Sequence, residues 1–265
     1  MSDTRAFVDG EPASTAALIR FARNAYHHFT TMQVRAGAVR GLDLHLARLS
    51  QATRALFDVE LDLFQLRRHL RVALAGQADA ALRISIGARN YSARAMPVPA
   101  QIESLILVDS PSLPRSDAMR LMSVQHMRHH AQFKHSGLFD VFALRRQALA
   151  CGFDDAVLLD DRHCINEGPT FNLGFFQDDA LIWPEADKLA GTSERLLQQA
   201  WAQVGGKHVV RPITLADLQH VSGGFACHSG GIWPLSAIDS QVLPVQRDAL
   251  ARLCQIWDGI AAEPI

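Results

Sequence analysis

The order of the elements expected between residues 138 and 204 is the feature that most constrains the fold. Apolar residues at helical spacing predict a helix over 138–151, with Arg145 and Arg146 facing outward. Three short strands are then expected, at 156–159, 170–176 and 180–183. The polar turns between these strands fit antiparallel pairing. Because strands and helices mix without a regular β-α-β rhythm, the sequence predicts an α+β fold rather than a doubly wound parallel sheet.

A break in periodicity divides the chain. Residues 109–118 include two prolines and three serines and match neither helical nor strand spacing. We therefore expect a linker over 109–118, between an N-terminal α/β subdomain at 1–108 and a C-terminal subdomain at 119–265.

The first of these subdomains is expected to combine strands with two helices. Residues 29–40 predict a hairpin that turns at Ala36 and Gly37. Asp43 is a candidate cap for the helix that follows, and a second amphipathic helix is expected over 61–75.

Composition excludes several classes of protein. The chain has 265 residues, a formal net charge of −1 and 48% hydrophobic residues, which is typical of a globular protein and gives no sign of nucleic-acid binding. No run of 18 apolar residues predicts a membrane span, and the first residues do not resemble a signal peptide. The four cysteines form no CxxC pair, so we expect reduced thiols and a cytoplasmic location.

Lysine is scarce, which narrows the search for a nucleophilic amine. Of 26 basic residues only three are lysine, namely Lys134, Lys188 and Lys207. Lys207 lies in a glycine-rich turn signal and Lys188 in the loop before Gly191. Lys134 lies among apolar neighbours just before a helix, and such surroundings lower the pKa of an amine.

Three features of the segment from Lys134 to Ser193 together suit pyridoxal 5'-phosphate (PLP). Lys134 could form a Schiff base, and Glu167 could pair with a pyridinium nitrogen. The expected helix start at Thr192 or Ser193 could bind a phosphate. Each residue also has an ordinary interpretation: a solvated lysine, a carboxylate at the end of a hairpin, and two hydroxyls that cap a helix.

Over residues 26–235 the sequence resembles the class IV, or fold-type IV, PLP enzymes. This family includes branched-chain and D-amino-acid aminotransferases and aminodeoxychorismate lyase. The similar motifs are His-Leu-Ala-Arg-Leu (45–49), Asn-Glu-Gly (166–168) with Asn-Leu (172–173), Gly-Thr-Ser (191–193) and Phe-Ala-Cys-His-Ser-Gly-Gly (225–231). The resemblance implies a homodimer and two α/β subdomains with the cofactor between them, the C-terminal subdomain being the PLP-binding one.

The resemblance also implies roles for single residues. Lys134 is the catalytic lysine that forms the Schiff base, and Glu167 pairs with the pyridine nitrogen. The remaining cofactor-binding positions are Arg48, Asn172, Gly191, Thr192, Ser193 and Ser229. The substrate side falls on Phe29, Thr31, Arg94 and His228.

The sequence departs from the family pattern in three places that bear on the substrate. The common Gly-Ile-Thr-Arg is Gly-Thr-Ser-Glu at 191–194, and a tyrosine of branched-chain aminotransferases is Phe139. Arg94-Ala-Met retains only the arginine of the Arg-x-His of D-amino-acid aminotransferases. Phe-Thr-Thr at 29–31 and Lys-His at 134–135 are similar to the lyases.

Three functions are therefore open. The first is a PLP-dependent aminotransferase that moves an amino group between an amino acid and a 2-oxo acid. The second is a lyase that releases pyruvate and 4-aminobenzoate from 4-amino-4-deoxychorismate. The third is a non-catalytic PLP-binding protein. We expect no metal site, because His126 and His130 lie four residues apart without the motif of a zinc helix.

Overall fold

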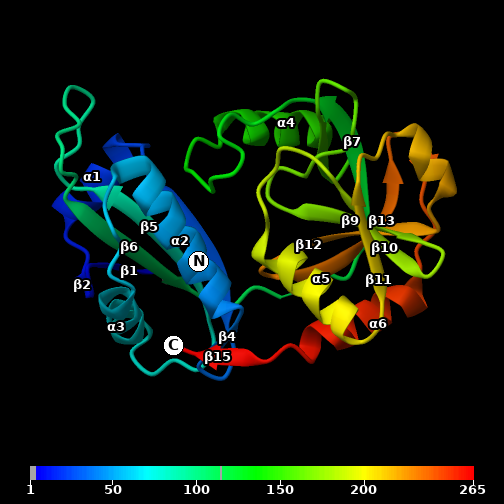
Figure 1. The fold of residues 1–265 in the computed structure, drawn as a ribbon. Coiled ribbons are helices and arrows are strands. Elements are labelled where there is room, and N and C mark those ends of the chain that lie inside the picture. Colours follow the sequence, from blue (N-terminus) through cyan, green and yellow to red (C-terminus); the bar gives the residue numbers. More distant parts are fainter. Residues whose placement is uncertain (1–3, 114) are drawn as a thin grey trace. The chain divides into compact units, whose positions relative to one another are not determined.

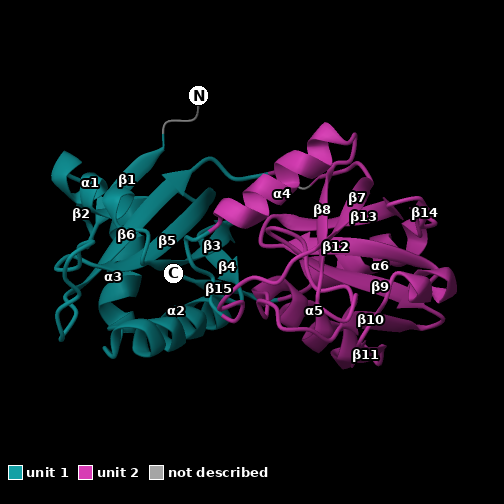
Figure 2. Cartoon of the chain, turned by 90° about the horizontal axis from the view of Figure 1, so that it is seen from above, with its two compact units in different colours: residues 1–112, 133–137, 261–265 teal, residues 113–132, 138–260 magenta. Residues whose placement is uncertain are grey.

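The chain forms two compact units. The computed structural model describes residues 4–113 and 115–265, so residue 114 of the expected linker lies outside the described part. The first unit comprises residues 1–112, 133–137 and 261–265, and the second comprises residues 113–132 and 138–260 (Figure 2). The change of unit at 112–113 falls within the segment 109–118. Two short segments from later in the chain, one of them containing Lys134, thus pack with the first unit.

A five-stranded antiparallel sheet forms the centre of the first unit. The strand order is β2-β1-β6-β5-β3. The strands are β1 (Arg5–Val8), β2 (Glu11–Pro12), β3 (His28–Val34), β5 (Ala80–Ala88) and β6 (Ile102–Asp109). Because side chains alternate between the faces of a strand, Met32 and Ile84 point to one face, and Phe29 and Arg83 to the other.

Two helices cover the face that carries Met32 and Ile84 (Figure 1). These are α2 (Leu42–Phe57) and α3 (Leu63–Leu74), and they pack with the sheet in one apolar cluster. The side chain of Asp62 caps α3 by accepting a hydrogen bond from the backbone N–H of Gln65 at 2.9 Å. The expected cap at Asp43 is wrong. Gly41, in the left-handed region with φ 66°, is the N-cap of α2, and Asp43 lies in its first turn.

The hairpin expected at 29–40 is confirmed only at its turn, where Arg35 and Ala38 form an antiparallel bridge with backbone hydrogen bonds of 2.9 and 3.0 Å. Beyond that bridge, β4 (Ala38–Arg40) forms no ladder with β3. It pairs with β15 (Ala262–Pro264) in a separate two-stranded sheet. The turn before β4 exists, with Ala36 and Gly37 at positive φ, but β3 pairs with β5 instead.

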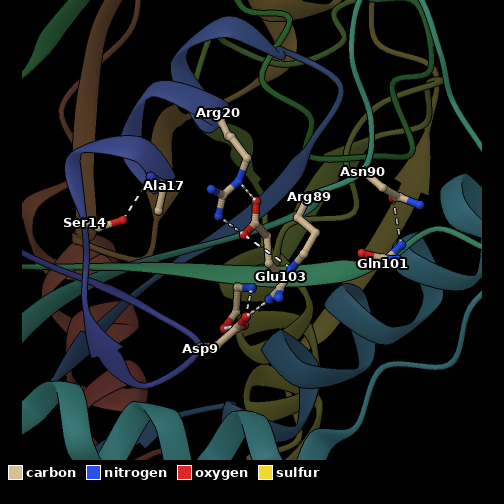
Figure 3. Close-up of polar contacts among 9 residues, drawn as sticks. Asp9, Ser14, Ala17, Arg20, Arg89, Asn90, Gln101 and Glu103 are labelled. Carbon is tan, nitrogen blue, oxygen red and sulfur yellow. Dashed lines mark hydrogen bonds and ion pairs between the residues drawn. The ribbon is translucent and has the colours of Figure 1, made fainter.

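An ionic network holds α1 (Thr15–Arg23) beside the sheet (Figure 3). Arg20 donates to both carboxylate oxygens of Glu103, at 3.2 and 2.7 Å. The Glu103 side chain is only 2% exposed, and its hydrogen bond and charge raise the pKa of Arg20. Arg89 pairs with Asp9 at 2.6 Å. This network braces the N-terminal helix on β6.

A mixed sheet forms the centre of the second unit. The strand order is β11-β10-β9-β12-β13-β7-β8, with β14 on β13. The strands are β7 (Met119–Gln125), β8 (Asp155–Leu159), β9 (Asn172–Gln177), β10 (Ala180–Pro184), β11 (Lys207–Arg211), β12 (Gly223–His228), β13 (Gly231–Ile238) and β14 (Gln241–Val242). Of the three strands expected to be antiparallel neighbours, only β9 and β10 pair. β8 lies parallel to β7 at one edge.

Helices and apolar clusters complete the second unit. The helices are α4 (Phe139–Ala150), α5 (Thr192–Gln203), the 3-10 helix η1 (Ala216–His220) and α6 (Arg247–Asp258). One apolar cluster includes Trp201 of α5 and Leu253 of α6, and a second includes Leu218 of η1. Arg145 does not face solvent as expected, because it binds the buried Asp155 at 2.8 Å. Within the described residues, no helix is long and apolar enough to cross a membrane.

Candidate active site

Lys134 is held against β3 by backbone hydrogen bonds. The N–H of Phe29 donates to the carbonyl of Lys134 at 2.7 Å, and the N–H of Ser136 donates to the carbonyl of His27 at 3.1 Å. His135 also forms an antiparallel bridge with His28. The segment 133–137 therefore adds a short extended piece beside β3. The Lys134 Nζ lies 5.1 Å from the centre of the Phe29 ring, within the range of a cation–π interaction.

A second cation, Arg83, contacts the same ring. The central carbon of its guanidinium lies 3.7 Å from the centre of the Phe29 ring. Burial lowers the pKa of Arg83, although an arginine stays charged at neutral pH. Within the part of the chain that the structure describes, no carboxylate forms an ion pair with Arg83. Two positive groups thus share one aromatic ring, an arrangement that favours an anion nearby.

On the opposite face of β3, Thr30 joins α2 through a short polar network. Arg48 donates to the hydroxyl of Thr30, and its Nη2 lies 3.3 Å from the Nδ1 of His45. The Thr30 hydroxyl lies 2.7 Å from the same Nδ1. Because arginine can only donate, we assign Nδ1 as the acceptor and Thr30 as its second donor. His45 is therefore neutral, and burial lowers its pKa, with Arg48 and Lys134 adding to the effect.

His28 of β3 also contacts α2, closer to the end of that helix. Its Nε2 lies 3.0 Å from the hydroxyl of Thr53, which itself donates to the carbonyl of Leu49 at 2.8 Å. The Nε2 must then carry the proton, and the imidazole is neutral. Burial lowers the pKa of His28 to about 4. His28 of β3 and His45 of α2 are thus both uncharged, and Arg48 supplies the positive charge between these two elements.

In the second unit, Glu167 forms a buried ion pair with Arg128. The Nε of Arg128 lies 2.8 Å from the Oε1 of Glu167, and their side chains are 8% and 6% exposed. Arg128 also donates to the carbonyl of Ala131 at 2.9 Å. Such a pair stabilises the ionised carboxylate in a position with little water. Sequence reasoning missed Arg128, because nothing in the run His126 to His130 distinguishes it from a solvated arginine.

Two asparagine side chains fix the loop that leads into α5. The amide of Asn166 donates to the carbonyl of Asp187 at 3.1 Å, and that of Asn172 donates to the carbonyl of Leu189 at 3.0 Å. A Cβ on Gly191 would overlap the Oδ1 of Asn172, so only glycine allows this approach. Asn172 therefore acts on the loop, and its expected contact with a cofactor remains a prediction.

The start of α5 is buried. Gly191 is the N-cap and makes no side-chain hydrogen bond, so the caps expected at Thr192 or Ser193 are wrong. Thr192, Ser193 and Glu194 instead form the first turn, where each is at most 6% exposed. The first backbone N–H groups of a helix have no partner within it and form its positive end.

The remaining expected residues occupy different places. His228 ends β12 and accepts a hydrogen bond from the N–H of Gly230 at 2.8 Å, and Ser229 lies in the turn that follows. Thr31 is half-buried on β3, and Arg94 is exposed in the loop between β5 and β6. The roles predicted for these four residues remain predictions.

Comparison with known proteins gives the family. A family model described as "Amino-transferase class IV" matches residues 27–238, which is most of the chain. The chain belongs to the class IV aminotransferase family. A search of curated protein sequences gave no significant match.

Solved structures of class IV members have the same fold. A 4-amino-4-deoxychorismate lyase from Pseudomonas aeruginosa is 26% identical, with a TM-score of 0.79 over 96% of this chain and 99% of that one. A hypothetical aminotransferase from Mycobacterium tuberculosis is 21% identical, with a TM-score of 0.83 over 97% and 98% of the two chains. A fold IV transaminase from Curtobacterium pusillum is 21% identical, with a TM-score of 0.73 over 86% and 84%. The expectation of the fold-type IV fold is confirmed.

The residues present fit the cofactor that family members bind. The first unit supplies an amine, at Lys134, with two arginines in the same unit. The second supplies an arginine-paired carboxylate, at Glu167, and a helix start whose glycine leaves no room for a Cβ. These are the groups required by an aldehyde, a protonated ring nitrogen and a phosphate. The departure from this pattern is the acidic residue Glu194 in the first turn of α5.

Proposed function

We propose that this class IV member is a PLP-dependent aminotransferase that moves an amino group between an amino acid and a 2-oxo acid. The observation that carries the proposal is the position of the Lys134 amine. Its Nζ lies against the Phe29 ring, which also holds the guanidinium of Arg83. A reactive amine beside a cation that no described carboxylate neutralises suits a substrate that carries both an amino group and a carboxylate.

The cofactor-binding roles follow from the contacts within each unit. We assign Glu167 to the ring nitrogen, because Arg128 stabilises its carboxylate in a buried position. The first turn of α5, Thr192 and Ser193 after Gly191, is assigned to the phosphate. Arg48 keeps the phosphate-binding role that the family resemblance implies, and the neutral partners Thr30 and His45 fix its guanidinium. When bound, PLP would supply an electron sink that stabilises negative charge on the substrate α-carbon.

Proton transfer is assigned to the Nζ of Lys134. A neutral lysine amine at this position would act as a base that takes a proton from the substrate and returns it. The amine lies against the Phe29 ring, with the guanidinium of Arg83 at the same ring. Arg83 would orient the substrate by binding its carboxylate, which a planar guanidinium does with two hydrogen bonds.

The visible absorption spectrum of the purified protein after incubation with PLP tests the proposal. The parent is expected to show the band of a lysine-bound cofactor, and Lys134→Ala is expected to lack it. Lys207→Ala, which removes an exposed lysine, is the matched control and should keep the band. Conversion of the band to a pyridoxamine spectrum by D-alanine, L-glutamate or L-leucine would support transamination. A parent without any band would refute PLP binding.

A second candidate function is 4-amino-4-deoxychorismate lyase. The Pseudomonas aeruginosa enzyme with that name is 26% identical over nearly all of both chains. The substrate of this candidate reaction, 4-amino-4-deoxychorismate, carries two carboxylates, and Arg83 could bind a carboxylate here as well. A lyase does not need a second substrate to regenerate its cofactor.

The two candidates differ in the products they release. Release of pyruvate and 4-aminobenzoate from aminodeoxychorismate, without conversion of the cofactor by amino donors, would favour the lyase. Bound PLP with neither reaction, tested on a broad panel of amines, would leave a non-catalytic PLP-binding protein.

We also propose a homodimer in the cytoplasm, as the family resemblance implies. Side chains on α4 provide an apolar surface for such contacts: Phe139 is 84% and Leu149 54% exposed. Light scattering after size-exclusion chromatography would give the mass in solution. A mass near 29 kDa, that of one chain, would contradict the dimer.

A further inference from the structure

A second buried ion pair lies at the start of α5. The Nζ of Lys188 is 2.6 Å from Oε1 and 2.8 Å from Oε2 of Glu194. The Lys188 side chain is 9% exposed and that of Glu194 is 6% exposed. Gln198, one turn later, donates a longer hydrogen bond to the same carboxylate at 3.3 Å. Both charges of this pair are therefore largely removed from water.

The pair lies within the loop that two asparagines already hold. Lys188 is the residue between the two carbonyls bound by Asn166 and Asn172. Glu194 belongs to the first turn of α5, directly after Thr192 and Ser193. The ion pair thus joins the loop before the turn to the helix after it.

The two charges of the pair have opposite effects on an anion bound at this helix start: Glu194 repels it and Lys188 attracts it. A carboxylate in the first turn is attracted by the positive end of the helix and competes there with any other anion. Burial raises the pKa of Glu194, and the charge of Glu167 acts in the same direction. The Lys188 ammonium acts in the opposite direction on the pKa of Glu194, and it would itself attract an anion.

A contribution to stability alone does not account for such a pair. Replacement of a buried ion pair by neutral side chains of similar size is often neutral or stabilising, because the ions no longer lose their hydration. The position of the pair, on both sides of the turn assigned to the phosphate, suggests a role in binding.

We propose that Lys188 and Glu194 are positioning residues that set how tightly the turn Gly191–Ser193 binds a phosphate. Lys188 draws the anion toward the turn, and Glu194 holds Lys188 in place and limits its attraction. This inference rests on the proposed function, which assigns that turn to the phosphate of PLP. It concerns Glu194, where the sequence departs from the family pattern.

Opposite changes in affinity from the two single substitutions would test the role. Glu194→Gln keeps an oxygen to accept from Lys188 but removes the negative charge, and should tighten PLP binding by about two- to fivefold. Lys188→Met leaves the carboxylate unopposed and should weaken binding by at least as much. Lys207→Met and Glu185→Gln make the same charge changes at exposed positions and serve as matched controls.

Equilibrium dialysis with PLP, with pyridoxal and with inorganic phosphate separates the causes. The opposite changes should be present for PLP and inorganic phosphate, absent for pyridoxal, which has no phosphate, and smaller at high salt. If both single variants bind more weakly and the double variant recovers both affinity and melting temperature, the pair only packs the loop, and the inference is wrong. Unchanged affinity in Glu194→Gln would also overturn it.

Different outcomes would contradict this inference and the proposed function. A parent that binds no PLP would contradict the proposed function, whereas the order of the variants toward inorganic phosphate would still test the pair. A parent that binds PLP, with variants that lack the opposite changes, would contradict the pair alone.

Discussion

Two buried carboxylates of the second unit each form an ion pair with a basic side chain. Glu167 has Arg128, and Glu194 has Lys188, at side-chain exposures below 10%. Removal of one member leaves a charge in a low-dielectric environment, which costs more than the pair itself contributes. The effect of a single substitution at these positions is therefore large and depends on the partner.

Arg128→Met is expected to destabilise the second unit by about 3–5 kcal/mol, because it leaves the Glu167 carboxylate buried without its cation. Adding Glu167→Gln to it should restore most of the stability without restoring PLP binding. Urea unfolding followed by tryptophan fluorescence reports on this unit, since all four tryptophans lie in it: Trp183, Trp201, Trp233 and Trp257. Arg128→Met with the stability of the parent would show that Glu167 does not depend on the pair.

His28 is expected to make the first unit sensitive to acid. The unfolded imidazole binds a proton near pH 6.5, whereas burial lowers the pKa in the folded chain to about 4. Its contribution to stability is complete above pH 6.5 and is lost as the pH falls toward 4. The difference corresponds to about 3 kcal/mol, and the lowered pKa of His45 acts in the same direction.

Hydrogen exchange of peptides from β3, measured between pH 4 and 7 and corrected for intrinsic rates, would test this expectation. His28→Gln should flatten the dependence on pH, while His208→Gln, an exposed substitution in the second unit, should not. A parent whose β3 protection does not change over this range would contradict the assignment of a neutral, buried His28.

At the scale of elements, the loop from Asp187 to Gly191 and the helix α5 behave as one piece. Two asparagine amides, one ion pair and one close approach of Asn172 to a glycine connect them. A binding turn held this way loses little freedom when it takes up a ligand, because its backbone is already ordered.

Gly191→Ala is expected to weaken PLP binding by at least tenfold, because the added Cβ would overlap the Asn172 side chain and displace the turn. Adding Asn172→Ala should restore part of the affinity by making room, although it loses the bond to Leu189. Ala190→Ser, an exposed change one residue earlier, is the control. PLP titration monitored by absorbance would measure all three, and wild-type affinity in Gly191→Ala would show that the turn is not tightly packed.

Elements with strong local signals could be predicted from the sequence, but their partners could not. The periodicity of 42–57 and 139–150 identified two helices correctly. The pairing of β4 with β15 was missed, because it joins residues more than 200 positions apart. β11 was missed because its exposed Val209 and Val210 follow a glycine pair that reads as a turn.

The site shows the same limit. The roles of Lys134 and Glu167 were predicted from the order and spacing of their motifs along the chain, and they remain proposals. Arg83, Arg128 and the pairing of Lys188 with Glu194 were missed, because a cation on an aromatic ring or a buried ion pair is formed only by packing. The scarcity of lysine was the one compositional signal that narrowed the candidates for a nucleophilic amine.

At the scale of the whole molecule, each unit is assembled from separate pieces of the chain. The first unit takes residues 133–137 and 261–265 in addition to 1–112. The late segment contributes β15 and the side chain of Ile265, which packs against the apolar cluster beneath α2 and α3. The core that supports β3 is therefore incomplete without residues far along the chain.

Ile265→Ala is expected to destabilise the first unit by about 1–2 kcal/mol, because the side chain is only partly buried and its loss leaves a small gap. Protection of β4 amides from hydrogen exchange should fall, while that of β12 in the second unit should not. Ala261→Ser, at an exposed position just before β15, is the control. Equal loss of protection in both units would mean that they unfold together.

The interleaved order of the segments has a consequence for synthesis on the ribosome. The polypeptide passes from one unit to the other at 112–113, 132–133, 137–138 and 260–261. The first 112 residues emerge first, yet their β4 strand has no partner until residue 264 has been made. A nascent chain therefore carries an unpaired edge through most of translation, and a pause late in the message would prolong its exposure to chaperones and aggregation.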